Sequence, residues 1–174
     1  MPFSKRDSKP GPALVFITTP TRDHMPLFSL PHLAHQAVLQ LGRAASEFDA
    51  GVAGYCLLPA SLSAIISFYT EYELAGFMYH YKWLSSRAMI ALDHGRFSEQ
   101  LYRKGKFRPW MGRFDQFYIS TMEQFKARLD YIHHEPVRCG LVDNPAKYDF
   151  SSAGDWLDET PGLIKIEKLI QISV

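Results

Sequence analysis

The sequence has few of the features that mark secreted or membrane-spanning chains. It holds two cysteines, Cys56 and Cys139, in 174 residues. That is too few for a disulfide framework and is typical of a protein from a reducing compartment. No apolar run reaches the roughly 20 residues that a transmembrane helix needs, and the first twelve residues contain no apolar stretch of a signal peptide. We therefore expect a protein of the bacterial cytoplasm with no membrane partner.

The modest charge and ample apolar content exclude further classes. Charged residues make up 21% and hydrophobic residues 47% of the chain, which excludes a disordered, collagen-like or coiled-coil protein. We expect a flexible tail over residues 1–12, one domain over 13–153 and a C-terminal extension over 154–174. The apolar positions of this extension fit a docked helix, an added strand or a surface for a partner, and the sequence does not distinguish these.

The order of the predicted elements indicates the fold class. A continuous apolar, β-branched run predicts a strand over residues 13–19, and further strands are predicted over 52–58, 62–68 and 114–119. Apolar residues at helical spacing predict helices over 30–48 and 72–92. A third helix is predicted to start at a capping box on Thr121 and to end at Pro136. The order β-α-β-β-α-β predicts an α+β, ferredoxin-like antiparallel sheet with helices packed on one face.

The net charge of +1 hides one strongly basic segment. Residues 82–113 contain eight lysines and arginines and two acids, a local balance of +6, whereas the flanking segments are neutral or acidic. Aromatic residues, Trp110 among them, lie between these cations. Cations neutralise phosphates, and an exposed ring stacks an unpaired base for ~1–3 kcal/mol, so the segment is a candidate nucleic-acid surface. A solvated loop explains the charge equally well, and Trp110 also fits a core position.

Five segments, taken together, resemble a known family. They are Val15–Thr18 (VFIT), Gly54–Pro59 (GYCLLP), Trp110–Phe114 (WMGRF), Tyr131–Val142 (YIHHEPVRCGLV) and Tyr148–Ser152 (YDFSS). In this order they resemble the single-tyrosine (HUH) transposases of the insertion-sequence-200-like superfamily, in the branch associated with repetitive extragenic palindromes (REP). The resemblance implies a ferredoxin-like domain that holds single-stranded and hairpin DNA and carries out DNA transposition.

The resemblance also shows what this chain lacks at the metal site of that family. There, a His-hydrophobic-His triplet after the second strand holds magnesium or manganese, which polarises the scissile phosphate. The matching positions here are Ser61 and Ser63. Hydroxyls are poor ligands for a divalent ion, so we expect no metal and no cofactor. Glu135 also departs from the family, which more often has asparagine at that position.

The nucleophilic tyrosine of the family has no counterpart where the resemblance implies one. Measured from Lys82 on the second predicted helix, the position falls on Leu84 or Ser85, and neither side chain supplies a phenol. Tyr79 and Tyr81 precede the lysine and are the fallback nucleophiles, although Tyr81 lies on the apolar stripe of that helix.

Three functions are consistent with these residues. We predict a transposase-like pseudoenzyme that binds single-stranded or hairpin DNA at the nucleoid and has lost cleavage and joining. The expected DNA contacts are Lys82, Arg87, Arg103, Lys104, Lys106, Arg108, Trp110 and Arg113. One alternative is an active transposase that uses Tyr81 or Tyr79. The other is a protein-interaction module, such as a homodimer, without nucleic-acid binding.

Overall fold

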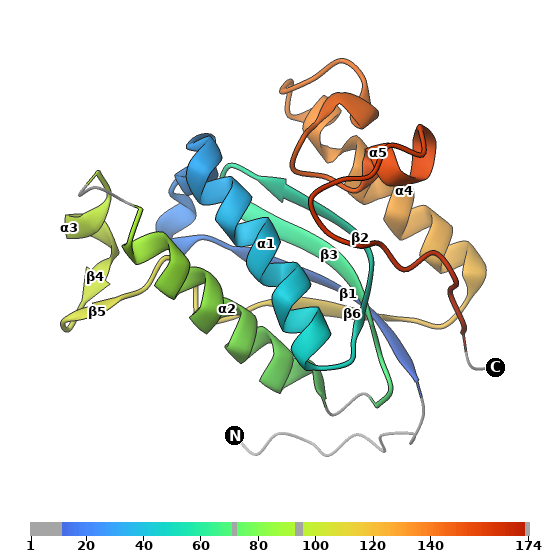
Figure 1. Cartoon of the computed structure of the whole chain (residues 1–174), viewed down its shortest axis with the longest axis horizontal. Helices are drawn as coiled ribbons and strands as arrows, with labels where there is room; N and C mark the ends of the chain where they lie inside the picture. The colour runs from blue at the N-terminus through green and yellow to red at the C-terminus, as the bar shows by residue number, and fades with distance from the viewer. Residues whose placement is uncertain (1–11, 71–72, 93–95, 173–174) are drawn as a thin grey trace.

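A four-stranded antiparallel sheet lies at the centre of the computed structural model, which describes residues 12–70, 73–92 and 96–172 (Figure 1). Its strands are β1 (Ala13–Pro20), β2 (Gly51–Leu58), β3 (Ser61–Phe68) and β6 (Asp115–Ile119), in the order β2-β3-β1-β6. All three strand pairings are antiparallel. This topology is ferredoxin-like, so the predicted α+β fold class is confirmed.

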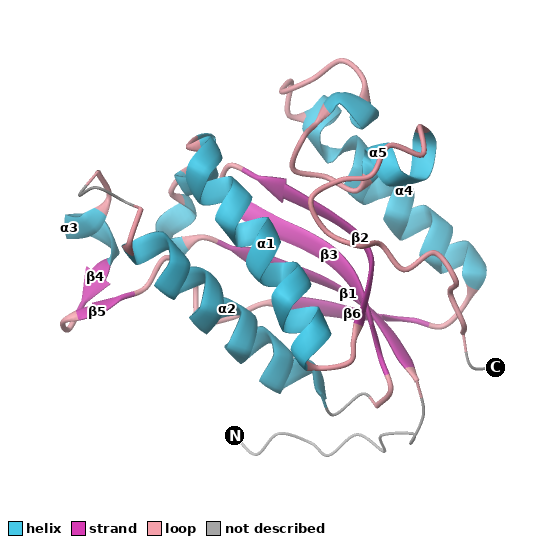
Figure 2. Cartoon of the chain, in the orientation of Figure 1, coloured by secondary structure: helices cyan, strands magenta, loops and turns pink. Residues whose placement is uncertain are grey.

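Two helices, α1 (Pro31–Glu47) and α2 (Leu74–Ile90), pack side by side on one face of the sheet (Figure 2). Alternate residues of each strand point to this face, and they meet the apolar stripes of the two helices. The strands contribute Val15, Ile17, Tyr55, Leu57, Leu62 and Ile66, and the helices contribute Leu33, Ala37, Leu41, Phe77, Met78 and Tyr81. These side chains form the larger of the two hydrophobic cores.

The third long helix, α4 (Met122–Arg138), differs from expectation because it covers the opposite face of the sheet. There, Phe125, Leu129 and Ile132 pack on the strand residues that point away from α1 and α2, among them Phe16 and Ile65. The apolar runs in β1 and β2 are the physical reason, because a strand covered on both faces has no polar side to alternate with.

The two ends of α4 follow different rules. The N-terminus confirms the predicted cap, because the Gln124 backbone N–H donates to Thr121 Oγ1 at 3.1 Å. The predicted end at Pro136 is wrong, because the helix continues to Arg138. A proline lacks an N–H and so removes a single backbone hydrogen bond, and here that happens only in the last turn of the helix.

Short elements fill the segment between α2 and β6. They are α3 (Ser98–Leu101) and a small hairpin of β4 (Tyr102–Arg103) and β5 (Lys106–Phe107). Lys104 and Gly105 form the turn of this hairpin with φ angles of 51° and 72°. Two residues with positive φ in a two-residue turn match the right-handed twist of the strands that the turn connects. The turn therefore holds Lys104 at an exposed tip.

After α5 (Ala153–Leu157), the C-terminal extension runs over the molecule without a helix or strand through residue 172. The Glu167 N–H donates to the Val52 carbonyl at 2.7 Å, which ties the extension to β2. Leu163, Ile164 and Ile166 pack on the α1 and α2 side, and Ile170 and Ile172 pack on the α4 side. The extension therefore buries most of its apolar residues against its own domain. Of the helices described, none is both long and apolar enough to cross a bilayer.

Candidate nucleic-acid interface

A hollow of about 640 Å³ separates α2 from the facing segment 106–114. Tyr79, Lys82 and Trp83 line it from successive turns of α2, and Lys106 and Arg108 line it from the facing segment. A volume of this size is typical of sites that hold a small molecule or part of a larger one. The hollow therefore gathers cations and aromatic rings from the basic segment that the sequence singled out.

Two cations hold the facing segment in place rather than pointing freely to solvent. Arg22 donates from Nε to the Arg108 carbonyl at 2.8 Å and from Nη2 to the Trp110 carbonyl at 3.1 Å. Lys82 Nζ donates to the carbonyls of Met111 at 2.9 Å and Arg113 at 3.1 Å. Lys82, expected as a DNA contact, thus has two of its donors occupied by the protein. Burial of this side chain lowers the pKa of its ammonium group to about 8.

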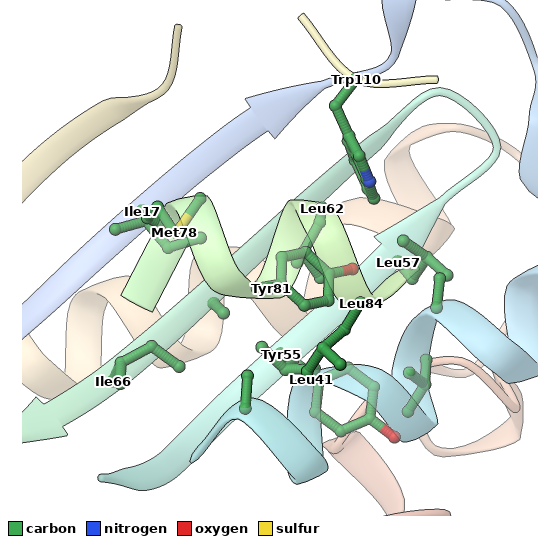
Figure 3. Packing of buried hydrophobic residues seen from close by; sticks show 14 of the residues in the cluster. Ile17, Leu41, Tyr55, Leu57, Leu62, Ile66, Met78, Tyr81, Leu84 and Trp110 are labelled. Atoms are coloured by element: carbon green, nitrogen blue, oxygen red, sulfur yellow. The ribbon is translucent and has the colours of Figure 1, made fainter. Parts of the chain in front are cut away.

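Trp110, another expected DNA contact, is a core residue. Its side chain is 4% exposed and packs against the rings of Phe28 and Tyr81, with centroids 5.3 and 5.7 Å away (Figure 3). Its indole N–H donates to Ser85 Oγ at 2.9 Å. The assignment of Trp110 to base stacking is therefore wrong, because a stacked base needs an open ring face.

The same contact explains Ser85, a polar residue within an apolar helix face. Its hydroxyl donates to the Tyr81 carbonyl at 2.8 Å while it accepts from Trp110. The buried hydroxyl is therefore satisfied on both sides. Ser85 joins α2 to the facing segment, and its role in this structure is a packing role.

The remaining predicted DNA contacts fall into two groups. Lys104, Lys106, Arg108 and Arg113 are exposed, and of these Lys106 and Arg108 line the hollow. Arg103 and Arg87 have partners of their own. Arg103 Nη2 lies 3.4 Å from Asp23 Oδ2, and the Arg87 guanidinium lies 5.1 Å from the Trp83 ring centroid. All six of these side chains are exposed, and Lys104, Lys106, Arg108 and Arg113 are the four with no ion pair or ring contact among the described residues.

Two exposed aromatic residues of α2 were not among the DNA contacts predicted from the sequence, although Tyr79 was named there as a fallback nucleophile. Tyr79 is 76% exposed and Trp83 is 47% exposed, and both line the hollow. Their spacing of four residues places them on one helix face, and Arg87 continues that face one turn later. This four-residue spacing was the signal in the sequence that could have identified both rings. Trp83 is also contacted by the His80 ring at 5.9 Å, so Tyr79 presents the more open ring.

The serines at the family's metal-ligand positions lie on the other side of the sheet. Ser63 pairs with Thr18 and Cys56 across the strands and faces α4. It is 1% exposed, and its Oγ lies 3.4 Å from Thr18 Oγ1. Leu84 and Ser85 belong to α2, on the opposite face. The expectation that they mark the nucleophile position beside Ser61 and Ser63 is therefore wrong.

One tyrosine, Tyr131, lies on α4 four residues before Glu135, and this spacing places the two side chains on the same face of the helix. The α4 side chains buried against the sheet are Phe125, Leu129, Ile132, His133 and Pro136. Tyr131 lies on the exposed side of α4, with the Arg138 guanidinium 4.2 Å from its ring centroid. The face that carries Ser61 and Ser63 thus meets a surface of α4 that is largely apolar but also includes His133 and Glu135.

Glu135 adds negative charge to this face. Burial raises the pKa of its carboxyl group, and the Ser63 hydroxyl and the Arg138 guanidinium oppose that rise. A carboxylate beside Ser63 would repel a phosphate placed there. Over residues 12–70, 73–92 and 96–172, no three His, Cys, Asp or Glu side chains form a metal-binding group. The expected lack of a cofactor stays a prediction.

The two fallback tyrosines differ sharply in access to solvent. Tyr81 is completely buried, and burial raises the pKa of its phenol. It cannot reach a phosphate in this structure, so its assignment as a nucleophile is wrong. Tyr79 is open to solvent at the edge of the hollow.

Comparisons with solved structures identify proteins with a similar fold. One solved structure, described as a REP-associated tyrosine transposase bound to a REP hairpin, matches with a TM-score of 0.68 and 16% identity, over 99% of this chain and 96% of its own. A second, described as a candidate transposase from Deinococcus radiodurans R1, matches with a TM-score of 0.52 and 12% identity, over 78% of this chain and 96% of its own. No family model and no curated protein matches the sequence. The expected resemblance to this transposase branch is thus confirmed at the level of the fold.

Proposed function

We propose that this protein binds single-stranded or hairpin DNA at the hollow between α2 and residues 106–114, and that it does not cut the DNA. The proposal rests on the residues that line the hollow, where exposed Lys106 and Arg108 lie opposite the open ring of Tyr79. Cations bind the phosphates, and the ring stacks an unpaired base. A structure with the same fold was solved with a REP hairpin bound, which supports this choice of nucleic acid.

The lack of cleavage is supported by the opposite face of the sheet. Ser61 and Ser63 stand where the family holds its metal, and much of the α4 surface above them is apolar. Glu135 brings a carboxylate close to Ser63, which disfavours a phosphate there. We infer a transposase fold that keeps a DNA-binding surface and has lost its metal and its nucleophile.

Binding is tested by titrating a labelled hairpin with the protein at several salt concentrations and measuring fluorescence anisotropy. The four exposed cations that have no ion pair or ring contact among the described residues predict a slope of log K against log [salt] near −3, at about 0.7 per phosphate of a single strand. Submicromolar binding at low salt with this slope is the expected result. Absence of binding at low ionic strength would overturn the proposal.

A second candidate, an active transposase, is favoured by one observation, the exposure of Tyr79. It predicts a covalent protein–DNA adduct in the presence of magnesium or manganese that is lost in Tyr79→Phe. The proposed function predicts no such adduct with either protein. Denaturing electrophoresis of the mixture separates the two.

The third candidate, an interaction module or homodimer, has weaker structural support. The apolar residues that follow α5 in the C-terminal extension pack on their own domain, and Leu169, at 86% exposed, is the exception among those described. Light scattering over a concentration series measures the oligomeric state, and we expect a monomer.

A further inference from the structure

A second hollow, of about 350 Å³, lies on the other flank of α2, between this helix and α1. Gln40 and Arg43 line it from α1, and Trp83 and Arg87 line it from α2. Trp83 also lines the hollow between α2 and residues 106–114, called the first hollow below, so this side chain stands between the two. Figure 1 shows the same arrangement, with α2 between α1 and the small hairpin of β4 and β5. The two hollows are therefore neighbours across one exposed ring.

The charges of the second hollow favour an anion. Arg43 and Arg87 are its two charged lining residues, and none of the described residues that line it carries a carboxylate. Both arginines are exposed. A guanidinium group is planar and binds two oxygens of a phosphate with parallel hydrogen bonds. The second hollow thus has the chemistry of a phosphate site.

Both guanidinium groups keep N–H donors for such a ligand. Arg43 donates from Nε to Glu47 Oε1 at 2.9 Å, and its two Nη groups donate no hydrogen bond within the described part of the chain. The Arg87 guanidinium lies 5.1 Å from the Trp83 ring centroid and donates no hydrogen bond to any described residue. The other oxygen of Glu47 contacts His80 Nε2, so both carboxylate oxygens are engaged. An exposed ion pair of this kind is weak and leaves Arg43 able to bind a phosphate.

The position of Trp83 between the hollows favours a nucleic-acid strand over a separate small anion. Cations that alternate with exposed aromatic rings are typical of surfaces that bind a single strand. Here Tyr79, Trp83 and Arg87 follow one another at four-residue spacing, and this row extends along α2 for about 12 Å. The exposed cations of the first hollow flank one side of the row, and Arg43 flanks the other.

We propose that a single strand of DNA bound in the first hollow continues across Trp83 into the second hollow, where Arg43 and Arg87 bind one of its phosphates. The inference rests on the proposed function, because the strand begins its path in the first hollow. It adds Arg43 to the binding surface, from a helix that carries none of the DNA contacts predicted from the sequence. Arg87, which was among those contacts, lies at the far end of the path.

The test compares a hairpin without a tail with hairpins that carry single-stranded oligothymidine tails of increasing length, at the 5′ end or at the 3′ end. Fluorescence anisotropy measures each affinity with the full chain over a series of salt concentrations. We expect a tail at one of the two ends to raise the affinity about ten-fold at low salt, because it adds charge-assisted hydrogen bonds. The slope of log K against log [salt] should grow in magnitude by about 0.7, the contribution of one phosphate. An affinity that depends on neither tail overturns the inference.

The double variant Arg43→Gln with Arg87→Gln tests the assignment to these two residues. It should lose the gain from the tail, so that it binds hairpins with and without a tail with similar affinity. The matched control, Lys126→Gln with Lys165→Gln, removes the same charge from exposed positions on α4 and the C-terminal extension and should keep the gain. A gain that persists in the arginine variant, or that is lost in both variants, overturns the assignment.

Photochemical crosslinking of the wild-type protein decides the case even if the arginine variant does not fold. A tail that contains 4-thiothymidine is irradiated in the complex, and the attached peptide is identified by mass spectrometry. We expect attachment within residues 40–43 or 83–88, which include the residues that line the second hollow. Attachment only outside these segments overturns the inference.

The hairpin without a tail separates the two proposals. If the protein binds it and gains nothing from either tail, the second hollow is not a DNA site and the proposed function stands. Absence of binding to all of these hairpins overturns both.

Discussion

Replacing Lys106 and Arg108 together by alanine should weaken DNA binding in a way that the salt dependence reveals. Both side chains are exposed and line the hollow, and neither forms a salt bridge among the described residues. Each phosphate contact on a single strand contributes about 0.7 to the slope of log K against log [salt]. Loss of two of the four cations without an ion pair or ring contact should therefore reduce the magnitude of the slope from about 3 to about 1.4.

The assay is fluorescence anisotropy of a labelled hairpin at 50 and 200 mM salt. Over that range the wild-type protein should lose about 50-fold in affinity and the double variant about 7-fold. The matched control is Lys126→Ala with Lys165→Ala, which removes the same charge from exposed positions on α4 and the C-terminal extension. Equal loss of slope in both double variants would refute the reasoning, since it would mean that net charge and not the hollow governs binding.

Three further predictions concern stability. Trp110→Phe should lower the free energy of unfolding in urea by about 1–3 kcal/mol, because Ser85 loses its donor, and leave the hairpin affinity of the folded protein unchanged. Burial lowers the pKa of His133 to about 4, below its unfolded value of about 6.5, so the unfolded chain binds the extra proton. Stability should thus fall by ~3 kcal/mol as pH drops from 6.5 to 4, and His133→Asn should remove this dependence. Burial raises the pKa of Glu135, so its contribution to stability declines as pH rises through the folded pKa, and Glu135→Gln should flatten that decline in urea unfolding at pH 5 and pH 8.

The order of strands and long helices along the chain could be predicted from apolar periodicity. The face of the sheet that α4 covers was predicted wrongly. The signal was present, because β1 and β2 contain apolar residues at successive positions and so need cover on both sides. The wrong face for α4 also misplaced the predicted nucleophile. Ser61 and Ser63 face α4, and a nucleophile sought on α2 was sought on the wrong side of the sheet.

The contact between Ser85 and Trp110 lay beyond sequence reasoning. Ser85 stood out as a polar residue in an apolar stripe, yet its partner is 25 residues away and reaches it only through the fold. The same holds for Lys82, whose two acceptors are backbone carbonyls that no side-chain pattern reveals. The pairing of Tyr79 and Trp83 could have been predicted from the sequence, because their spacing of four residues puts them on one helix face.

The central claim, DNA binding without cleavage, is tested most directly by incubating the protein with a hairpin labelled at both ends, with magnesium or manganese present. The products are then separated on a denaturing gel beside a native gel of the same mixture. The account predicts a shifted complex on the native gel and an intact, protein-free strand on the denaturing gel. A shortened strand, or a strand that carries covalently bound protein, would contradict it.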